Sequence, residues 1–283
     1  MVLPITALLL LLTQAASGST DSWAHHGADA ASTNFADISQ IDSTNFDSLR
    51  IIWRWPTPDR ALLDSLDAES GPWRSTPIFV DGVLYTISAM NLVSAVDAAS
   101  GKTLWSFDSE AWKVDGFFHG YARGVSYWTD GEVRRILFGT SSSYLYSLDA
   151  DTGVPDIDFG ERGRVDLTQG LSREFDRRHY GFVSPPVICR DVVITGSSGM
   201  DWRLGRDLPA LVPPGDVRGF DVRTGKQLWV FHSIPHDDEY GADTWAPGAW
   251  QEHGAANVWS MMSVDEELGY VYLPHSTPDN DFY

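Results

Sequence analysis

Three short motifs carry side chains suited to binding carboxylates, aromatic rings and divalent cations. Arg123 begins Arg-Gly-Val-Ser-Tyr-Trp, and its planar guanidinium suits bidentate contact with a carboxylate. Trp259 ends Asn-Val-Trp, and its indole offers a flat apolar face. Asp201 follows Gly-Ser-Ser-Gly-Met, and carboxylate oxygens are ligands that Ca²⁺ prefers. The three residues are far apart in the chain, so they act together only if the fold brings them to one place.

Two other clusters have simpler interpretations. The run His236-Asp237-Asp238-Glu239 has the side chains of a metal site, but an exposed loop between structural repeats explains it as well. The pair His25-His26 has no further ligand at a metal-binding spacing, so we expect both on the surface. The sequence contains no phosphate-binding glycine-rich loop, nucleophile elbow or zinc signature.

An internal repeat indicates the architecture that must position these residues. Residues 95–105 (AVDAASGKTLW) recur as residues 219–229 (GFDVRTGKQLW), and residues 147–153 (SLDADTG) form a shorter copy. In each copy a strand ends in Asp, which accepts hydrogen bonds from turn amides, and the Gly that follows supplies a positive φ. Two β-rich runs precede each copy, and a further set begins at Trp259.

This pattern predicts an all-β protein, a β-propeller of which about four blades are present. A β-sandwich would also show short strands and turns, but a repeat that ends in Trp argues against it. The repeats are irregularly spaced, so we expect insertions near residues 171–181 and 200–215. Loops on a rigid scaffold carry binding groups, so these insertions should form the functional rim.

Composition narrows the choice of partners. The net charge is −19, with 39 Asp and Glu against 20 Lys and Arg, so phosphate backbones and anionic membranes are repelled. We therefore expect no nucleic-acid binding. The single cysteine, Cys189, excludes an intrachain disulfide, and its apolar neighbours indicate a buried strand.

The first residues resemble a secretory signal. An apolar run over residues 7–12 is too short to span a bilayer, and small residues follow it, so residues 1–18 are expected to be a signal peptide. The protein should then be periplasmic or otherwise exported, with membrane association left open, and residues 19–283 form the mature chain. Four blades would leave open sheet edges, so we expect this to be the N-terminal half of a longer ring, with the remaining half as its partner.

The repeat Asp-x-x-(Ser/Thr)-Gly-Lys-x-x-Trp resembles the tryptophan-docking motif of the quinoprotein dehydrogenases, which have eight blades, and the resemblance implies that Trp105 and Trp229 are docking residues. The opening segment WAHHGAD (residues 23–29) and the stretch SVDEELGYVYLP (residues 263–274) resemble the same family. The adjacent-cysteine ring of the alcohol enzymes is absent, because Gly120-Tyr121-Ala122 precede Arg123. The likeness is therefore to the glucose-dehydrogenase-like branch.

The resemblance implies that the chain binds pyrroloquinoline quinone, a flat tricarboxylated ortho-quinone, together with Ca²⁺. On the family pattern Arg123 binds the quinone, Trp259 stacks beneath it, and Asn257 takes a position that is usually Thr. Arg74 stands where the alcohol branch often has Glu and is expected to bind a cofactor carboxylate. Further cofactor contacts are expected from the Gly-Ser-Ser-Gly turn, through Ser197, Ser198 and Gly199.

The same pattern assigns the metal ligands. Asp201 is the candidate carboxylate ligand, and Thr277 stands where the family often has Asn. The family's catalytic aspartate, the general base, is expected beyond Tyr283, so no residue here is assigned that role.

These features predict an exported dehydrogenase that oxidises a sugar, polyol or alcohol hydroxyl by hydride transfer to the bound quinone. Electrons would then pass to a quinone or cytochrome acceptor. The alternative is a non-catalytic propeller scaffold similar to the outer-membrane assembly lipoproteins, although the sequence has no lipid-attachment cysteine after the signal.

Overall fold

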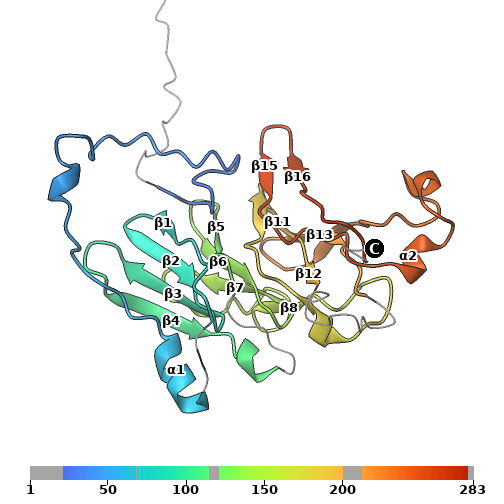
Figure 1. Ribbon diagram of the computed structural model, residues 1–283, viewed down its shortest axis with the longest axis horizontal. Coiled ribbons are helices and arrows are strands. Elements are labelled where there is room, and N and C mark those ends of the chain that lie inside the picture. The colour runs from blue at the N-terminus through green and yellow to red at the C-terminus, as the bar shows by residue number, and fades with distance from the viewer. Residues whose placement is uncertain (1–21, 68, 70, 115–120, 200–211, 280–283) are drawn as a thin grey trace, which may run out of the picture.

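The computed structural model describes residues 22–279 except 68, 70, 115–120 and 200–211, so the predicted signal peptide and Asp201 lie outside the described residues. Three four-stranded antiparallel sheets follow one another along the chain, and a two-stranded sheet follows them (Figure 1). Each four-stranded sheet keeps its strands in sequence order, as propeller blades do. The predicted all-β fold is confirmed, with three full blades and the first hairpin of a fourth.

The strands have the following bounds. Blade 1 contains β1 (Ile78–Val80), β2 (Val83–Ile87), β3 (Leu92–Asp97) and β4 (Thr103–Asp108). Blade 2 contains β5 (Ser126–Thr129), β6 (Arg134–Gly139), β7 (Tyr144–Asp149) and β8 (Arg164–Asp166). Blade 3 contains β10 (Val187–Cys189), β11 (Val192–Thr195), β13 (Val217–Asp221) and β14 (Gln227–Phe231). The last hairpin pairs β15 (Ser263–Asp265) with β16 (Tyr270–Tyr272).

Helices and short strands occupy the connections. The helices are α1 (Asp59–Leu66), α2 (Ala249–Glu252), η1 (Phe46–Ser48), η2 (Ala111–Lys113), η3 (Arg177–His179) and η5 (Ala242–Thr244). The first predicted insertion ends in a small sheet, in which β9 (Tyr180–Gly181) pairs with β12 (Ser198–Gly199). Residues 200–211 of the second predicted insertion lie outside the described residues. No helix among the described residues is both long and apolar enough to cross a bilayer.

Tryptophans hold neighbouring blades together. Trp105 on β4 donates from Nε1 to the Ala150 carbonyl of blade 2 at 2.9 Å. Its ring lies against Gly153, where a Cβ would come within 2.5 Å of the indole. Trp53, ahead of blade 1, makes the same contact with the turn that contains Gly101, and donates to the Ala98 carbonyl at 3.0 Å. The predicted docking role of Trp105 is confirmed.

Trp229 holds the equivalent position on β14. Its ring lies against Gly219, its antiparallel partner in the same sheet, and packs on the cluster that joins blade 3 to the last hairpin. The described residues include only the first hairpin of the next blade, so the docking role of Trp229 stays a prediction. On blade 2 the docking tryptophan is replaced by Val165, whose methyl group faces Gly225 of blade 3. The shorter second copy of the repeat, which lacks the tryptophan, therefore matches a real difference in packing.

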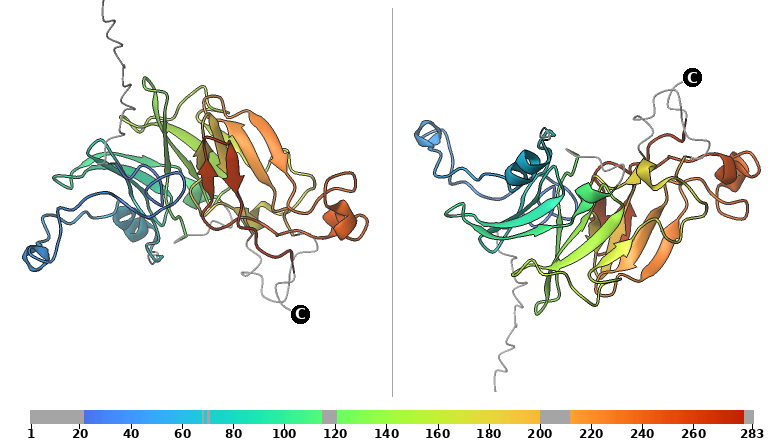
Figure 2. Two further views of the ribbon diagram at one scale, coloured as in Figure 1. Left: turned by 90° about the horizontal axis from the view of Figure 1, so that it is seen from above. Right: turned by 90° about the horizontal axis from the view of Figure 1, so that it is seen from below.

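The hydrophobic core is divided into layers between adjacent sheets. One buried cluster joins blades 1 and 2 and includes Ile78 and Phe138, and a second joins blades 2 and 3 and includes Leu145 and Val193. A third cluster packs Cys189 and other residues of blade 3 against the last hairpin, so the predicted burial of this cysteine is confirmed. The two views of Figure 2 show the successive sheets turned relative to one another.

Candidate cofactor-binding site

Four residues hold equivalent positions just ahead of the blades. Arg74, Arg123, Ser184 and Trp259 each lie three or four residues before the first strand of their blade, namely β1, β5, β10 and β15. We call them the lead-in residues. The first strands of neighbouring blades contact one another, β5 with β10 and β10 with β15, so the first strands lie nearest the axis about which the blades are arranged. The radial arrangement therefore brings the lead-in residues together.

Hydrogen bonds connect the lead-in segments from blade to blade. The Thr76 N–H donates to the Arg123 carbonyl at 2.9 Å, and the Arg123 N–H donates to the Val183 carbonyl at 2.8 Å. The Trp259 carbonyl accepts from Arg123 Nη1 at 2.9 Å and also from the Ser184 hydroxyl. Residues that are 136 positions apart in sequence are thus in direct contact.

Arg123 and Trp259, predicted to share a site, lie against each other. The guanidinium carbon of Arg123 is 5.1 Å from the centroid of the Trp259 ring. Trp259 remains 47% exposed, which is high for so large an apolar side chain. It therefore leaves indole surface free for a planar ligand.

Positive charge accumulates beside this indole. Burial and then the charge of Arg74 lower the pKa of Arg123, which shows that two cations lie near one another. Arg74 stacks on Tyr121, with its guanidinium carbon 4.1 Å from the ring centroid. Within the described part of the chain, no carboxylate lies within ion-pair distance of Arg74 or Arg123. Two cations without an acidic partner suit an anionic ligand.

The Gly-Ser-Ser-Gly turn lies against the segment that carries Trp259. A Cβ on Gly196 would come within 2.2 Å of the Val258 carbonyl, so only glycine permits this approach. Ser197 is buried and lines a cavity of about 10 Å³ together with Ser184 and Trp259. Ser198 and Gly199 form β12, which fixes the end of the turn. The structure thus places this turn beside the indole, as the sequence predicted.

Asn257 and Thr277 lie in two adjacent segments behind Trp259. Asn257 is buried, and its Oδ1 accepts a hydrogen bond from Ser276 Oγ at 2.6 Å. The Thr277 carbonyl accepts from the Ala256 N–H at 2.9 Å, and the residue is exposed. The cofactor contact of Asn257 and the metal contacts of Thr277 and Asp201 therefore stay predictions.

The sequence did not assign Tyr121, Ser184 or His26 to this site. The signal for Ser184 was its position, because it precedes β10 by the same interval that separates Arg123 from β5. His26 lies close to Arg123, and burial together with that positive charge lowers the pKa of His26. The imidazole is therefore held in its neutral form at the edge of the site.

The expectation that His25 and His26 lie on the surface is wrong. Both are partly buried and line a cavity of about 30 Å³ among the first strands of blades 2 and 3 and the last hairpin. Burial also lowers the pKa of His25. The opening segment lies in this position because Trp23 bridges to Phe79 on β1, with both backbone N–H groups donating across the pair at 2.8 Å.

Comparison with known proteins connects this geometry to one family. The family model described as "PQQ: Glucose/ethanol/alcohol dehydrogenase, beta-propeller domain" matches residues 23–283. The glycerol dehydrogenase large subunit of Gluconobacter thailandicus is 30% identical over 95% of this chain and 36% of its own length. Quinoprotein glucose dehydrogenase A of Acinetobacter calcoaceticus is 28% identical over 94% of this chain and 34% of its own.

A third relative, the quinate/shikimate dehydrogenase (quinone) of Acinetobacter baylyi, is 28% identical over 93% of this chain and 33% of its own length. The chain spans about a third of the length of these relatives. The quinohemoprotein alcohol dehydrogenase of Comamonas testosteroni shares the fold, with a TM-score of 0.70 at 22% identity, over 91% of this chain and 35% of that one. The relatives are named as dehydrogenases, which does not favour the scaffold alternative.

Proposed function

The chain belongs to the β-propeller family of glucose, ethanol and alcohol dehydrogenases that use pyrroloquinoline quinone (PQQ), and from this membership we propose that it forms the cofactor-binding part of such an enzyme. The substrate would be a sugar, polyol or other alcohol, oxidised at a hydroxyl group. The proposal extends to an exported enzyme that passes its electrons to a quinone or cytochrome acceptor.

One observation carries the proposal: Arg123 and the half-exposed indole of Trp259 lie in contact beside a second cation, Arg74, and no described carboxylate pairs with either arginine. This arrangement fits a flat, aromatic polyanion. The cations would neutralise carboxylates, while the indole would support the fused rings. The cavity of about 10 Å³ next to Trp259 is too small for the ligand, so we expect it to lie on the exposed face of the indole.

When bound, PQQ would supply an electrophilic carbonyl as the hydride acceptor. The residues of this chain would bind and orient it. Arg123 is held by the Trp259 carbonyl and the Ser184 hydroxyl, so its guanidinium is positioned before a ligand arrives. Asn257 and Ser276 hold the backbone that leads into Trp259. This pre-organisation lowers the entropy lost when the ligand binds.

We also propose that Ca²⁺ accompanies the quinone, with Asp201 and Thr277 as its candidate ligands from this chain. Both offer oxygen atoms, which Ca²⁺ prefers, and a divalent ion beside a quinone carbonyl would increase its electrophilicity. Thr277 is a neutral ligand, so most of the charge compensation would have to come from carboxylates.

The test is reconstitution of the full-length protein with PQQ and Ca²⁺, followed by dye-linked oxidation of glucose, glycerol, quinate and ethanol. We expect activity with at least one of these substrates that depends on added PQQ. PQQ binding without oxidation of any of them would refute the enzymatic role, and absence of PQQ binding would refute the whole proposal.

A further inference from the structure

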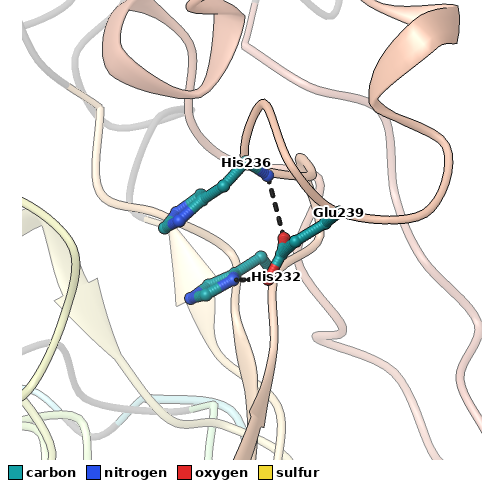
Figure 3. Close-up of side chains that lie close together, drawn as sticks. All are labelled: His232, His236 and Glu239. Carbon is teal, nitrogen blue, oxygen red and sulfur yellow. Dashed lines mark hydrogen bonds and ion pairs between the residues drawn. The ribbon is translucent and has the colours of Figure 1, made fainter.

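A cluster of potential metal ligands lies at the end of blade 3, on the loop that leads to α2. One donor atom from each of His232, His236 and Glu239 can be chosen so that all three lie within 4.8 Å of one another (Figure 3). Glu239 bridges the two histidines: its Oε1 is 2.8 Å from His232 Nδ1, and its Oε2 accepts from the His236 backbone N–H at 2.8 Å. The carboxylate thus already points at the pair.

The strand register adds a fourth potential ligand. The ladder between β13 and β14 ends at the pair Val217–Phe231, and Asp216 and His232 are the next residue on each strand, so continuing the same register would place them opposite each other. Side chains at opposite positions of an antiparallel pair lie on the same face. Burial raises the pKa of the Asp216 carboxyl, and the charges of His232 and Arg218, a backbone hydrogen bond from Ser233 and the charge of His236 act in the opposite direction.

Asp216 has an unusual environment for a carboxylate. It is only 4% exposed, and its Oδ2 has no hydrogen-bond partner among the described residues. A buried carboxylate oxygen without a partner is costly unless a cation or a donor compensates it. None of the groups assigned to the cofactor site serves this purpose.

We propose that Asp216, His232, His236 and Glu239 bind one divalent transition-metal ion of the zinc class. Two imidazole nitrogens with two carboxylate oxygens form a donor set that suits such ions, whereas Ca²⁺ takes oxygen ligands alone. The expectation that His236–Glu239 is merely an exposed loop omitted His232 and Asp216, which the strand pairing brings to it.

Metal binding requires a local rearrangement. The His232 and His236 rings are stacked, with centroids 3.8 Å apart and planes at 12°, so their nitrogen lone pairs lie in two nearly parallel, separate planes and do not converge on one point. Both can reach one ion at about 2.0–2.1 Å only if one ring turns. His236 is the ring that turns, because it lies in the loop, whereas His232 directly follows β14. His236 also stacks on Trp250, with centroids 4.1 Å apart, so metal binding should change that contact.

The site is connected to the segment that carries Trp259. Gly215, next to Asp216, approaches so closely that a Cβ there would lie 1.9 Å from the Ala255 carbonyl and 2.7 Å from the Asn257 backbone. The Ala255 N–H donates to the Pro213 carbonyl at 3.0 Å. An ion bound at Asp216 would therefore fasten the loop over residues 232–253 to the backbone that precedes Trp259.

The experiment titrates Zn²⁺ into the full-length protein after treatment with a chelator that prefers transition ions to Ca²⁺. We expect stoichiometric tight binding, and Co²⁺ in place of Zn²⁺ should give a visible absorption band that reports nitrogen and oxygen ligands. His232→Ala and His236→Ala should each weaken Zn²⁺ binding by roughly 100-fold, and Asp216→Asn by roughly 10-fold. These measurements need neither PQQ nor activity, so their outcome is independent of the proposed function.

His253→Ala is the matched control, because His253 lies on the same loop but pairs with Asp279 at 3.1 Å. It should leave Zn²⁺ affinity unchanged. The proposal is overturned if the unaltered protein takes up no stoichiometric Zn²⁺, which requires no variant to fold. It is also overturned if the His232 and His236 variants retain wild-type affinity, or if His253→Ala weakens binding as much as they do.

Discussion

Replacing Arg123 by glutamine should weaken PQQ binding without disturbing the indole beneath it. The substitution removes the positive charge, but the glutamine amide still offers a donor for the Trp259 carbonyl, which in the unaltered protein accepts from Arg123 Nη1 at 2.9 Å. A hydrogen bond to a charged group contributes about 1.5–3 kcal/mol, and about 1.4 kcal/mol corresponds to a tenfold change in affinity. We therefore expect a dissociation constant roughly 10- to 100-fold higher.

The assay is equilibrium titration of PQQ, followed by quenching of tryptophan fluorescence in the full-length protein. Arg123→Lys keeps the charge but loses the planar fork, so it should fall between wild type and Arg123→Gln. Arg60→Gln is the control, because Arg60 is an exposed residue of α1 that pairs only with Asp64. Equal PQQ affinity in wild type and Arg123→Gln would refute the assignment of Arg123 to the cofactor.

Two further predictions concern stability. Gly153→Ala should lower the free energy of unfolding by about 2–4 kcal/mol in a urea titration, because Gly153 has a positive φ of 70° and a Cβ there would lie within 2.5 Å of the Trp105 ring. Gly131 has a φ of 97° but open space around it, so Gly131→Ala should lower the same free energy by only about 1 kcal/mol. Equal losses in the two variants would contradict the docking argument. Burial lowers the pKa of His25 and His26 in the folded state, whereas an unfolded histidine has a pKa of about 6.5. As the pH is lowered, the unfolded chain therefore binds protons that the folded chain does not, and the urea midpoint should decrease from about pH 7.5 to about pH 5.5. Changing both histidines to glutamine should make this decrease smaller; an unaltered pH dependence would show that these imidazoles are not responsible.

The repeat predicted the blades well because each copy carries both parts of the docking contact. The Asp–Gly turn fixes the chain reversal within a few residues, and Trp105 docks on the corresponding turn of the next copy, where its partner Ala150 is 45 positions away in sequence. Trp53 makes the same contact but was missed, since no Asp–Gly turn precedes it. Trp229 carries the same motif, and its docking partner would lie in a part of the next blade beyond the described strands.

The candidate site was predictable only where family resemblance supplied the partners. Arg123 and Trp259 are separated by 136 residues, and their contact arises because equivalent positions of successive blades converge. The burial of His26 depends on first strands from different sheets, and the neighbourhood of Asp216 and His232 depends on the register of β13 against β14. Neither relation is visible in local sequence patterns.

The central claim is that Arg123 and Trp259 contact one and the same quinone. An experimental structure of the full-length protein with PQQ tests it most directly. We predict a PQQ carboxylate within hydrogen-bonding distance of the Arg123 guanidinium and the fused rings parallel to the Trp259 indole. PQQ bound away from the lead-in residues, or with Arg123 and Trp259 on opposite sides of the protein from it, would contradict the account.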